Sequence, residues 1–395
     1  MKVAVIKLGS RISFNANDTS GGNGEARSII KILETAGIET HIFTKILKKD
    51  DLLPQYKWHN LSNAGALDGK QLFDHEAMNQ CDALLVINGN VNFFGGAEDA
   101  EQIMNYYMIN HFAGPVFYAY CDPALTLKQL WPAIEKKPWA GNWKKEDIEI
   151  VRDDIIYLSQ PYDVEKVQEQ LGKNCVQPAD IIHFPFEQFP CLNEQLQPAP
   201  LEELEVDLSY GGTMRGGKRI MKMVEFYFGH EGISVEMFGK ITKEDFTEHP
   251  KIGNGLKFTY KDEWFPKFTG PVKYAEMLPK MNKALAHVVI GDPLYEQIND
   301  MAQRAYESIW SGVITFIDKD LDSLRRVYGA DKELADFLYV ASQKEVNEKI
   351  KLIKADPQMR QQLLDDQLKA IAFNPQNYAM RLRDLLASGS EAQEV

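Results

Sequence analysis

The sequence predicts an α/β protein with two doubly wound domains and a helical C-terminal tail. The first observation behind this prediction is length, because 395 residues exceed the size at which a single hydrophobic core usually stops growing. The second is a repeated alternation of short apolar runs with stretches long enough for a crossover helix, which favours parallel strands covered by helices. Because this alternation occurs in two separate series, we expect two parallel sheets.

The first series begins at the N-terminus and predicts a domain over residues 1–190. Residues 2–8 are β-branched and apolar, Gly9 permits a tight turn, and residues 25–37 have apolar side chains at helical spacing. This is the strand, loop and helix that open a doubly wound sheet. Further short apolar runs predict strands at 40–43, 83–88, 116–121 and 155–159.

The second series follows residues 195–201, QLQPAPL, whose prolines and polar residues are typical of an interdomain connection. It predicts a domain over 191–365, with strands at 206–210, 234–238, 286–290 and 313–317 and helices at 217–229 and 299–311. Residues 366–395 are expected to form a helix that packs back on the N-terminal domain. Two such domains suit a ligand in a cleft between them, at the carboxyl ends of the strands.

Charge and cysteine content narrow the function classes. The formal net charge of −13 argues against a polyanionic partner, because lysine and arginine supply most nonspecific affinity for nucleic acid. Basic residues nevertheless cluster at 45–49, 136–145 and 214–222, so a local basic groove that binds nucleic acid is the alternative.

The cysteines are scattered without a CxxC pair, which favours reduced thiols over a structural zinc site. The apolar N-terminal run is too short for a signal peptide or a membrane span, so we expect a cytoplasmic protein.

A glycine-rich segment in the second domain is the first candidate site. Residues 210–219, YGGTMRGGKR, follow a predicted strand and open a predicted helix. Glycines let the backbone approach an anion, helix-start amides point towards it, and Arg215 and Arg219 add charge-assisted hydrogen bonds. The segment therefore predicts a pyrophosphate-binding loop, and the alternative is a glycine turn before a basic helix.

Two further candidate groups follow predicted strands. Arg304 and Glu307 are three residues apart in a predicted helix, so they share one helix face. This spacing suits an arginine that binds a phosphate beside a glutamate that binds a ribose hydroxyl. The alternative is an ordinary surface ion pair. Asp122 comes directly after a strand in the first domain, where ligands of open sheets bind and where a carboxylate can accept a proton from an attacking alcohol. The alternative for Asp122 is a helix cap before Pro123.

A second glycine-rich segment, residues 88–96 with the sequence NGNVNFFGG, places Phe93 and Phe94 after another predicted strand. Phenylalanines in such segments usually complete a core. An exposed ring can instead wedge into a base stack. The residues alone leave both interpretations open.

Taken together, these motifs resemble those of the DNA β-glucosyltransferases of T-even bacteriophages, enzymes of the GT-B architecture with two Rossmann-like domains facing a central cleft. The matching motifs follow the same order along most of the chain, which makes them more specific together than singly. They are MKVAVIKLG at 1–9, NFFGG at 92–96, WPAIEKKPWA at 131–140, FPFEQF at 184–189, YGGTMRGGKR at 210–219, IGD at 290–292 and RAYE at 304–307.

The resemblance implies an inverting glycosyltransferase that moves a sugar from a UDP-sugar to the hydroxymethyl oxygen of 5-hydroxymethylcytosine in duplex DNA, with base flipping. Mg²⁺ or Mn²⁺ would be bound mainly through the donor diphosphate. The resemblance implies that Asp122 is the general base and that Glu25 is a carboxylate that touches the sugar. The residues that it assigns to the UDP-sugar are Gly212, Thr213, Arg215, Arg219, Arg304, Glu307 and Glu187. Those that it assigns to the DNA and the flipped base are Asn92, Phe93 and Phe94.

Two departures from the family pattern bear on the sugar and on the DNA. The chain has extra residues between about 46 and 78, and the loop at 9–24 is rewritten. Glucose is the family default for the transferred sugar, and arabinose is the alternative. Other functions also stay open: a glycosyltransferase for a non-DNA acceptor, a noncatalytic protein that binds DNA or a nucleotide sugar, and a sugar-nucleotide epimerase. We expect a monomer in the cytoplasm of the infected bacterial host.

Overall fold

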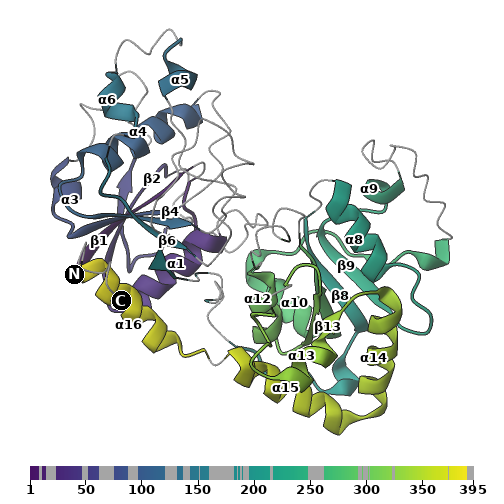
Figure 1. The fold of residues 1–395 in the computed structure, drawn as a ribbon. Coiled ribbons are helices and arrows are strands. Elements are labelled where there is room, and N and C mark those ends of the chain that lie inside the picture. The colour runs from purple at the N-terminus through teal and green to yellow at the C-terminus, as the bar shows by residue number, and fades with distance from the viewer. Residues whose placement is uncertain are drawn as a thin grey trace. The chain divides into compact units, whose positions relative to one another are not determined.

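The computed structural model of the chain describes two compact units (Figure 1). The described residues within 1–14, 24–189 and 374–388 belong to the first unit, and those within 195–373 belong to the second. The described residues are 1–8, 11–14, 24–46, 52–61, 75–87, 97–120, 131–136, 143–150, 152–159, 182–184, 186, 189, 195–213, 217–247, 262–291, 296, 301, 303–322, 325–371 and 373–388. No helix within these ranges is both long and apolar enough to cross a membrane.

The first unit contains, among its described residues, seven parallel strands in the order β3-β2-β1-β4-β5-β6-β7. The strands are β1 (Lys2–Lys7), β2 (Glu39–Thr44), β3 (Lys57–Asn60), β4 (Ala83–Ile87), β5 (Val116–Tyr120), β6 (Ile156–Ser159) and β7 (Ile182–His183). The helices are α1 (Gly24–Thr35), α3 (His75–Asn79), α4 (Ala97–His111), α5 (Trp131–Ile134), α6 (Lys145–Ile148) and α16 (Pro375–Ser388). The strand order reverses between β1 and β4, which makes this the topological switch point.

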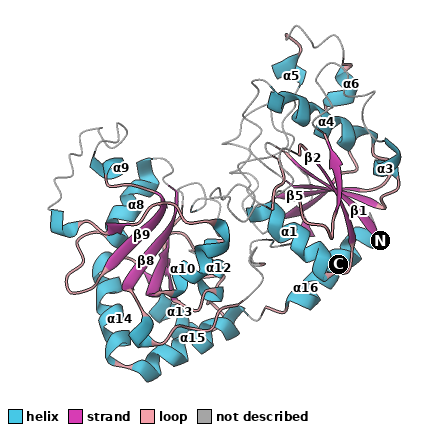
Figure 2. Cartoon of the chain, turned by 180° about the vertical axis from the view of Figure 1, so that it is seen from behind, coloured by secondary structure: helices cyan, strands magenta, loops and turns pink. Residues whose placement is uncertain are grey.

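Burial explains why these segments form a parallel sheet covered by helices. All five side chains of β4, ALLVI, are buried, as expected for a central strand that is covered on both faces. Ile29 and Leu33 of α1 are also fully buried. The C-terminal helix α16 packs along α1 (Figure 2), where Leu382 is buried and Arg383 Nη1 donates to the carbonyl of Ala36 at 3.4 Å.

The second unit contains, among its described residues, six parallel strands in the order β10-β9-β8-β11-β12-β13. The strands are β8 (Val206–Thr213), β9 (Val235–Lys240), β10 (Lys267–Phe268), β11 (Ala284–Val289), β12 (Ile314–Asp318) and β13 (Tyr339–Val340). The α-helices are α8 (Gly217–Tyr227), α9 (Glu244–Thr247), α10 (Met277–Asn282), α12 (Arg304–Trp310), α13 (Lys332–Leu338), α14 (Gln343–Ala355) and α15 (Pro357–Ile371). Short 3-10 helices lie at Leu201–Glu203, Asp262–Trp264 and Tyr274–Glu276. The switch point of this sheet lies between β8 and β11.

The predicted fold class, two doubly wound α/β domains with a helical C-terminus, is confirmed. The sequence patterns do not predict β3, β7, β10 or β13, and these are the strands at the four sheet edges. Edge strands are short and need no apolar cover on both faces, so they leave little pattern in the sequence. The chain passes from one unit to the other after Phe373, whereas the expected boundary at 366 lies inside α15. Polar and apolar residues are mixed in the same way in α15 and α16, so the pattern does not reveal where one helix ends and the other begins. Pro375 is the first residue of α16.

Candidate functional site

Glycines allow close packing at the carboxyl ends of β8 and β9. Gly211 and Gly212 lie within β8, where they pair with Phe238 and Gly239 of β9. A Cβ atom on Gly211 would come 2.5 Å from the Phe238 ring. One on Gly239, whose φ is +118°, would come 1.8 Å from the carbonyl oxygen of Gly212. The packing of two adjacent strands therefore requires glycine here, and the predicted start of a loop at residue 211 is wrong because the strand continues to Thr213.

Arg219 lies in the first turn of α8, shortly after this strand end. Its Nη2 atom donates to the Tyr210 hydroxyl at 3.1 Å, and Tyr210 is 2% exposed. The Tyr210 ring packs edge-on against Tyr227 with 5.2 Å between centroids and stacks with His287 at 6.1 Å. Buried aromatic side chains thus fix the position of this guanidinium at the carboxyl end of the sheet.

Arg304 begins α12 and contacts Glu307 in the same turn. Arg304 Nη1 and Glu307 Oε2 are 3.2 Å apart, with side-chain exposures of 25% and 7%. The same nitrogen contacts the sulfur atoms of Met277 and Met281 on α10 at 2.7 and 3.7 Å. The predicted shared helix face is present, and the burial of Glu307 distinguishes this pair from an ordinary surface ion pair.

Both arginines act electrostatically on the buried Tyr227, and Arg304 also acts on the buried His287. Burial, with a smaller contribution from the Arg304 charge, lowers the pKa of His287 to about 3, so this imidazole is neutral at pH 7. Burial raises the pKa of the Tyr227 phenol, and the charges of Arg219 and Arg304 oppose this shift. Two cations therefore lie near a neutral aromatic core, an arrangement that suits an anion with several oxygens, such as a diphosphate.

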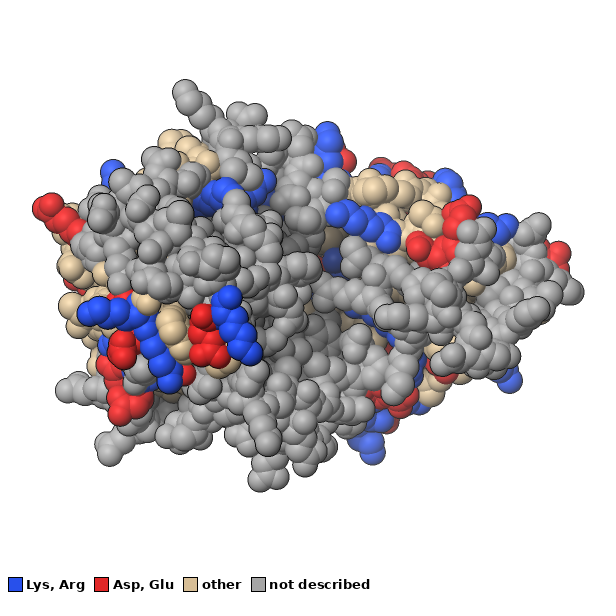
Figure 3. Space-filling model, turned by 90° about the horizontal axis from the view of Figure 1, so that it is seen from above, with Lys and Arg blue, Asp and Glu red and all other residues tan. Residues whose placement is uncertain are grey.

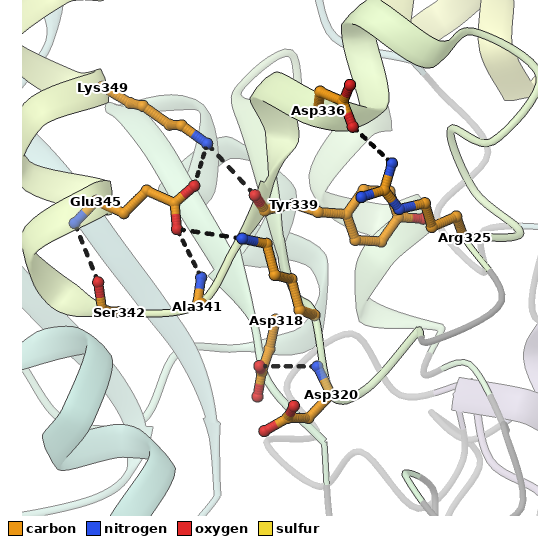
Figure 4. A network of polar contacts seen from close by, with 10 residues as sticks. Asp318, Asp320, Arg325, Asp336, Tyr339, Ala341, Ser342, Glu345 and Lys349 are labelled. Carbon is orange, nitrogen blue, oxygen red and sulfur yellow. Dashed lines mark hydrogen bonds and ion pairs between the residues drawn. The ribbon is translucent and has the colours of Figure 1, made fainter.

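The neighbouring carboxyl end of β12 carries a second polar cluster, and its charges compensate one another. Lys222 lies 2.9 Å from the buried Asp318 and 2.6 Å from Asp320. Burial by itself would lower the pKa of Lys222, but the hydrogen bonds to Asp320 and Asp318 raise it. Figure 4 shows the adjoining part of this cluster, where Glu345 and Lys349 of α14 lie 2.7 Å apart. This network joins β12, β13 and α14, and we assign it no ligand.

Lysines of the predicted basic clusters also pair with nearby carboxylates. Lys145 and Glu149 lie 3.0 Å apart, and Lys222 binds Asp320 as described above. On the face drawn in Figure 3, described lysines and arginines lie beside aspartates and glutamates. Such pairing is consistent with the net charge of −13. Affinity for DNA therefore does not follow from the lysine-rich sequence clusters alone.

In the first unit, Ile12 and Ser13, which follow β1 in the chain, bind neighbouring elements. The Ile12 amide donates to Thr44 Oγ1, at the end of β2, at 2.9 Å. Arg27 Nε, from α1, donates to the Ser13 carbonyl at 2.8 Å. The backbone of Glu25 lies in the first turn of α1.

The described members of the predicted donor site lie together in the second unit. They are Gly212, Arg219, Arg304 and Glu307. Other predicted residues lie outside the described residues: Asp122, Arg215, Glu187, Asn92, Phe93 and Phe94. For Glu25 and Thr213, the backbone is described, in α1 and β8, and the side chain is not.

Two members of the donor-site cluster were not assigned a role from the sequence. His287 is the polar residue in the buried strand ALAHVV, and a polar side chain inside an apolar strand is a usable signal. Tyr210 precedes the strand glycines, but its hydroxyl contact with Arg219 depends on how α8 packs over the sheet. Only the tertiary structure shows that the two side chains stack on one another.

Comparisons with known proteins place the chain among enzymes with this architecture. The family model for bacteriophage T4 β-glucosyltransferase matches residues 60–190. The DNA β-glucosyltransferase of Enterobacteria phage T4 is 25% identical over 369 residues, which are 93% of either chain. The phage T4 BGT structure in complex with UDP and Mn²⁺ has a TM-score of 0.69 and 22% identity, and the match covers 99% of this chain and 98% of that one. An α-glucosyltransferase in complex with UDP has a TM-score of 0.56 and 11% identity, over 98% and 100% of the two chains.

The sequence and the fold lead to the same relative. The sequence similarity extends over 93% of both chains, so it includes both units and not one shared domain. The structural match likewise covers 99% of this chain. The chain is therefore a homologue of the phage T4 DNA β-glucosyltransferase with the GT-B fold of that enzyme, and the prediction of a glycosyltransferase is confirmed.

Proposed function

We propose that the protein is an inverting glycosyltransferase that moves glucose from UDP-glucose to the hydroxymethyl oxygen of 5-hydroxymethylcytosine in duplex DNA. The observation that carries this proposal is the cluster of Arg219, Arg304 and Glu307 at the carboxyl ends of β8 and β11. It occurs in a chain that is homologous over both units to a DNA β-glucosyltransferase. The T4 enzyme has been solved with UDP-glucose, which supports the choice of donor.

The donor diphosphate would bind Arg219 and Arg304, and a ribose hydroxyl would donate to Glu307. Guanidinium groups pair with phosphate oxygens through parallel hydrogen bonds and stay charged at any working pH. Negative charge that develops on the departing diphosphate is then stabilised by cations that are already in position. The contacts of Arg304 with Glu307 and of Arg219 with Tyr210 provide this positioning.

A divalent cation would bind mainly through the donor diphosphate and offset part of its negative charge. The T4 enzyme with UDP and Mn²⁺ supports this part of the proposal. Across the described ranges, no group of three or more His, Cys, Asp or Glu side chains is arranged to hold a metal ion. We therefore propose no side chain of this chain as a metal ligand.

Asp122 is proposed as the general base and Glu25 as the second catalytic carboxylate, which would orient the sugar. The hydroxymethyl oxygen attacks the anomeric carbon, the bond from that carbon to the diphosphate oxygen breaks, and the hydroxymethyl proton passes to Asp122. A carboxylate with a pKa of ~4 is a far weaker base than an alkoxide, so the proton moves late in the displacement. The positions of the two residues support these roles, because Asp122 follows β5 and Glu25 opens α1.

Phe94, with Asn92 and Phe93, is proposed to occupy the space left by the target nucleotide. Chemistry on a stacked base requires its extrusion, at a cost on the order of a few kcal/mol. These three residues follow β4, one of the two strands at the switch point of the first sheet, which supports a place at the acceptor site. Because the relative is a phage protein, we also propose that the reaction takes place in the cytoplasm of the infected bacterial host.

Mass spectrometry of nucleosides tests the reaction directly. Hydroxymethylcytosine duplex DNA is incubated with the protein, Mg²⁺ or Mn²⁺, and UDP-glucose, UDP-galactose or UDP-arabinose in turn. We expect a hexose mass gain with UDP-glucose that Asp122→Asn abolishes, and no gain on a matched duplex with unmodified cytosine. A pentose mass gain with UDP-arabinose would show that arabinose, and not glucose, is the transferred sugar. No gain with any donor would overturn the DNA acceptor, and release of UDP without DNA would point to another acceptor.

A further inference from the structure

Helix α8, which carries Arg219, is attached to the sheet of the second unit by apolar and by polar contacts. Ile220 and Met223 are fully buried and belong to the core of this unit. At the C-terminal end of α8, the Tyr227 hydroxyl donates to the Val288 carbonyl of β11 and accepts from the Val288 amide at 2.9 Å. The C-terminal part of the helix is therefore tied to β11.

Lys222 ties the N-terminal part of α8 to another strand. Its Nζ atom lies 2.9 Å from Oδ2 of Asp318, the last residue of β12, whose side chain is 1% exposed. The other carboxylate oxygen of Asp318 accepts from the Asp320 amide at 3.1 Å (Figure 4). One oxygen thus contacts an ammonium and the other an amide, which fixes the position of this buried carboxylate. We call Lys222 and Asp318 the α8 brace.

The α8 brace lies next to Arg219 on the helix. Arg219 and Lys222 are three residues apart on α8, so they share one face in adjacent turns. Arg219 binds Tyr210 of β8, and Lys222 contacts Asp318 of β12. In the sheet, β8 and β12 are the two neighbours of β11, and the switch point lies between β8 and β11. The start of α8 is therefore tied to strands on both sides of β11, where ligands of such sheets bind.

We propose that the α8 brace positions Arg219 for the donor diphosphate, and that Asp318 is a positioning residue for donor affinity that acts through Lys222. This inference rests on the proposed function, in which Arg219 binds the diphosphate. A buried ion pair adds little net stability, because desolvation of the two charges offsets their attraction. Its main consequence here is geometric, since it sets where α8 lies relative to β12, and a guanidinium pairs with a phosphate only in a narrow range of positions.

The opposite charges of the two brace residues separate positioning from simple attraction. If Asp318 acted only through its charge, its neutralisation would strengthen the binding of an anionic donor. If Asp318 acts through position, its neutralisation releases Lys222 and weakens donor binding, although a negative charge is lost. The direction of the change in donor affinity therefore distinguishes the two explanations.

The test measures the Kd for UDP by isothermal titration calorimetry in the presence of Mg²⁺. We expect Asp318→Asn and Lys222→Gln each to weaken UDP binding about fivefold to tenfold, because either change breaks the brace and lets Arg219 shift. The effect should stay moderate, since Ile220, Met223 and Tyr227 still hold α8 on the sheet.

Asp320→Asn is the matched control. It makes the same change of charge beside the same lysine, because Asp320 lies 2.6 Å from Lys222 Nζ. The Asp320 side chain is 68% exposed, however, and exposed ion pairs contribute little to position or stability. The Kd for UDP should therefore change less than about twofold in Asp320→Asn.

A double-mutant cycle tests whether the brace acts through Arg219. Arg219→Leu removes the positioned guanidinium and leaves Arg304 and Glu307 in place, so weak UDP binding should remain. In this background, Asp318→Asn should weaken UDP binding by less than about twofold, because there is no longer a guanidinium to position. A brace that only stabilised the fold would cause the same loss in both backgrounds.

Each outcome decides the inference. Tighter or unchanged UDP binding in Asp318→Asn, equal losses in Asp318→Asn and Asp320→Asn, or an undiminished loss in the Arg219→Leu background would overturn it and leave the proposed function intact. If Asp318→Asn does not fold, Lys222→Gln is judged by the same comparisons with Asp320→Asn and Arg219→Leu. The expected pattern of UDP affinities without sugar transfer to DNA would support the brace and overturn the proposed acceptor. Absence of UDP binding by the unmodified protein would overturn both.

Discussion

At the residue scale, burial decides what the polar side chains of the second unit can do. Glu307 exposes 7% of its side chain, and a carboxylate at that depth requires a cation or a donor. His287 is fully buried, and its imidazole stays neutral beside Arg304. The same sequence patterns on an exposed helix or strand would indicate ordinary surface residues, so the functional value of these groups lies in their surroundings.

Replacing Glu307 with Gln should raise the KM for UDP-glucose about tenfold while kcat changes less than about threefold, because a ribose hydroxyl loses a charged acceptor. Steady-state kinetics measure both constants. A donor that lacks the ribose hydroxyl provides the control, since the unmodified protein with this donor should resemble the variant with UDP-glucose. Additive losses when variant and analogue are combined would contradict the assigned contact.

Because the pKa of His287 is lowered in the folded protein, we expect the free energy of unfolding to depend on pH. Its pKa is about 3 in the folded protein and 6.5 as a model value, so between these limits the unfolded chain binds a proton that the folded protein does not. The free energy of unfolding should therefore fall as the pH falls below about 6.5, by up to about 1.4 kcal/mol per pH unit. The midpoints of urea unfolding at pH 7.5 and 5.0 measure this loss, and His287→Leu should reduce it. An equal loss in the variant would assign the effect to other groups.

At the element scale, packing between neighbouring strands explains a motif that the sequence analysis assigned to an anion. Gly211 and Gly212 belong to β8, and their lack of side chains lets Phe238 and Gly239 of β9 approach. The same glycines lie in the last residues of β8, which ends at Thr213, and α8 begins at Gly217. Strand packing and anion binding both favour glycine in this segment, and the sequence alone does not show which of the two requires it.

Gly239→Ala should lower the free energy of unfolding by about 2–4 kcal/mol, because the added Cβ meets the Gly212 carbonyl at 1.8 Å and the φ of +118° disfavours a side chain. Gly37→Ala is the matched control. Gly37 also has a positive φ, +68°, but no atom lies within 4 Å of an added Cβ. Its loss should be about 1 kcal/mol. Urea unfolding compares the two variants, and equal losses would refute the close strand contact.

At the scale of the whole molecule, the end of the chain completes the unit in which it began. After α15 in the second unit, α16 returns to the first unit and packs along α1. Tyr378 of α16 also contacts Phe184, with 4.6 Å between ring centroids. The first unit thus contains residues from both ends of the chain.

Leu382→Ala should destabilise the first unit by about 2–5 kcal/mol, because this fully buried side chain lies in the helix that packs on α1. Hydrogen exchange followed by mass spectrometry should show faster exchange in α1. Leu352→Ala on α14 is the control, since Leu352 is 55% exposed and its loss should cost less than about 0.5 kcal/mol. Unchanged exchange in α1 after Leu382→Ala would contradict the packing of α16 on α1.

Local patterns in the sequence were sufficient to predict the two doubly wound sheets, since buried parallel strands such as ALLVI and crossover helices leave strong local signals. They also placed Arg304 and Glu307 on one helix face, because helical spacing is itself local. The tertiary structure decided which strands lie at the sheet edges, how far β8 extends, and that α15 continues past residue 366. It also decided that Tyr210 holds Arg219 and that Lys222 contacts Asp318. These contacts join residues on different elements, and their energies depend on packing that no single stretch of sequence contains.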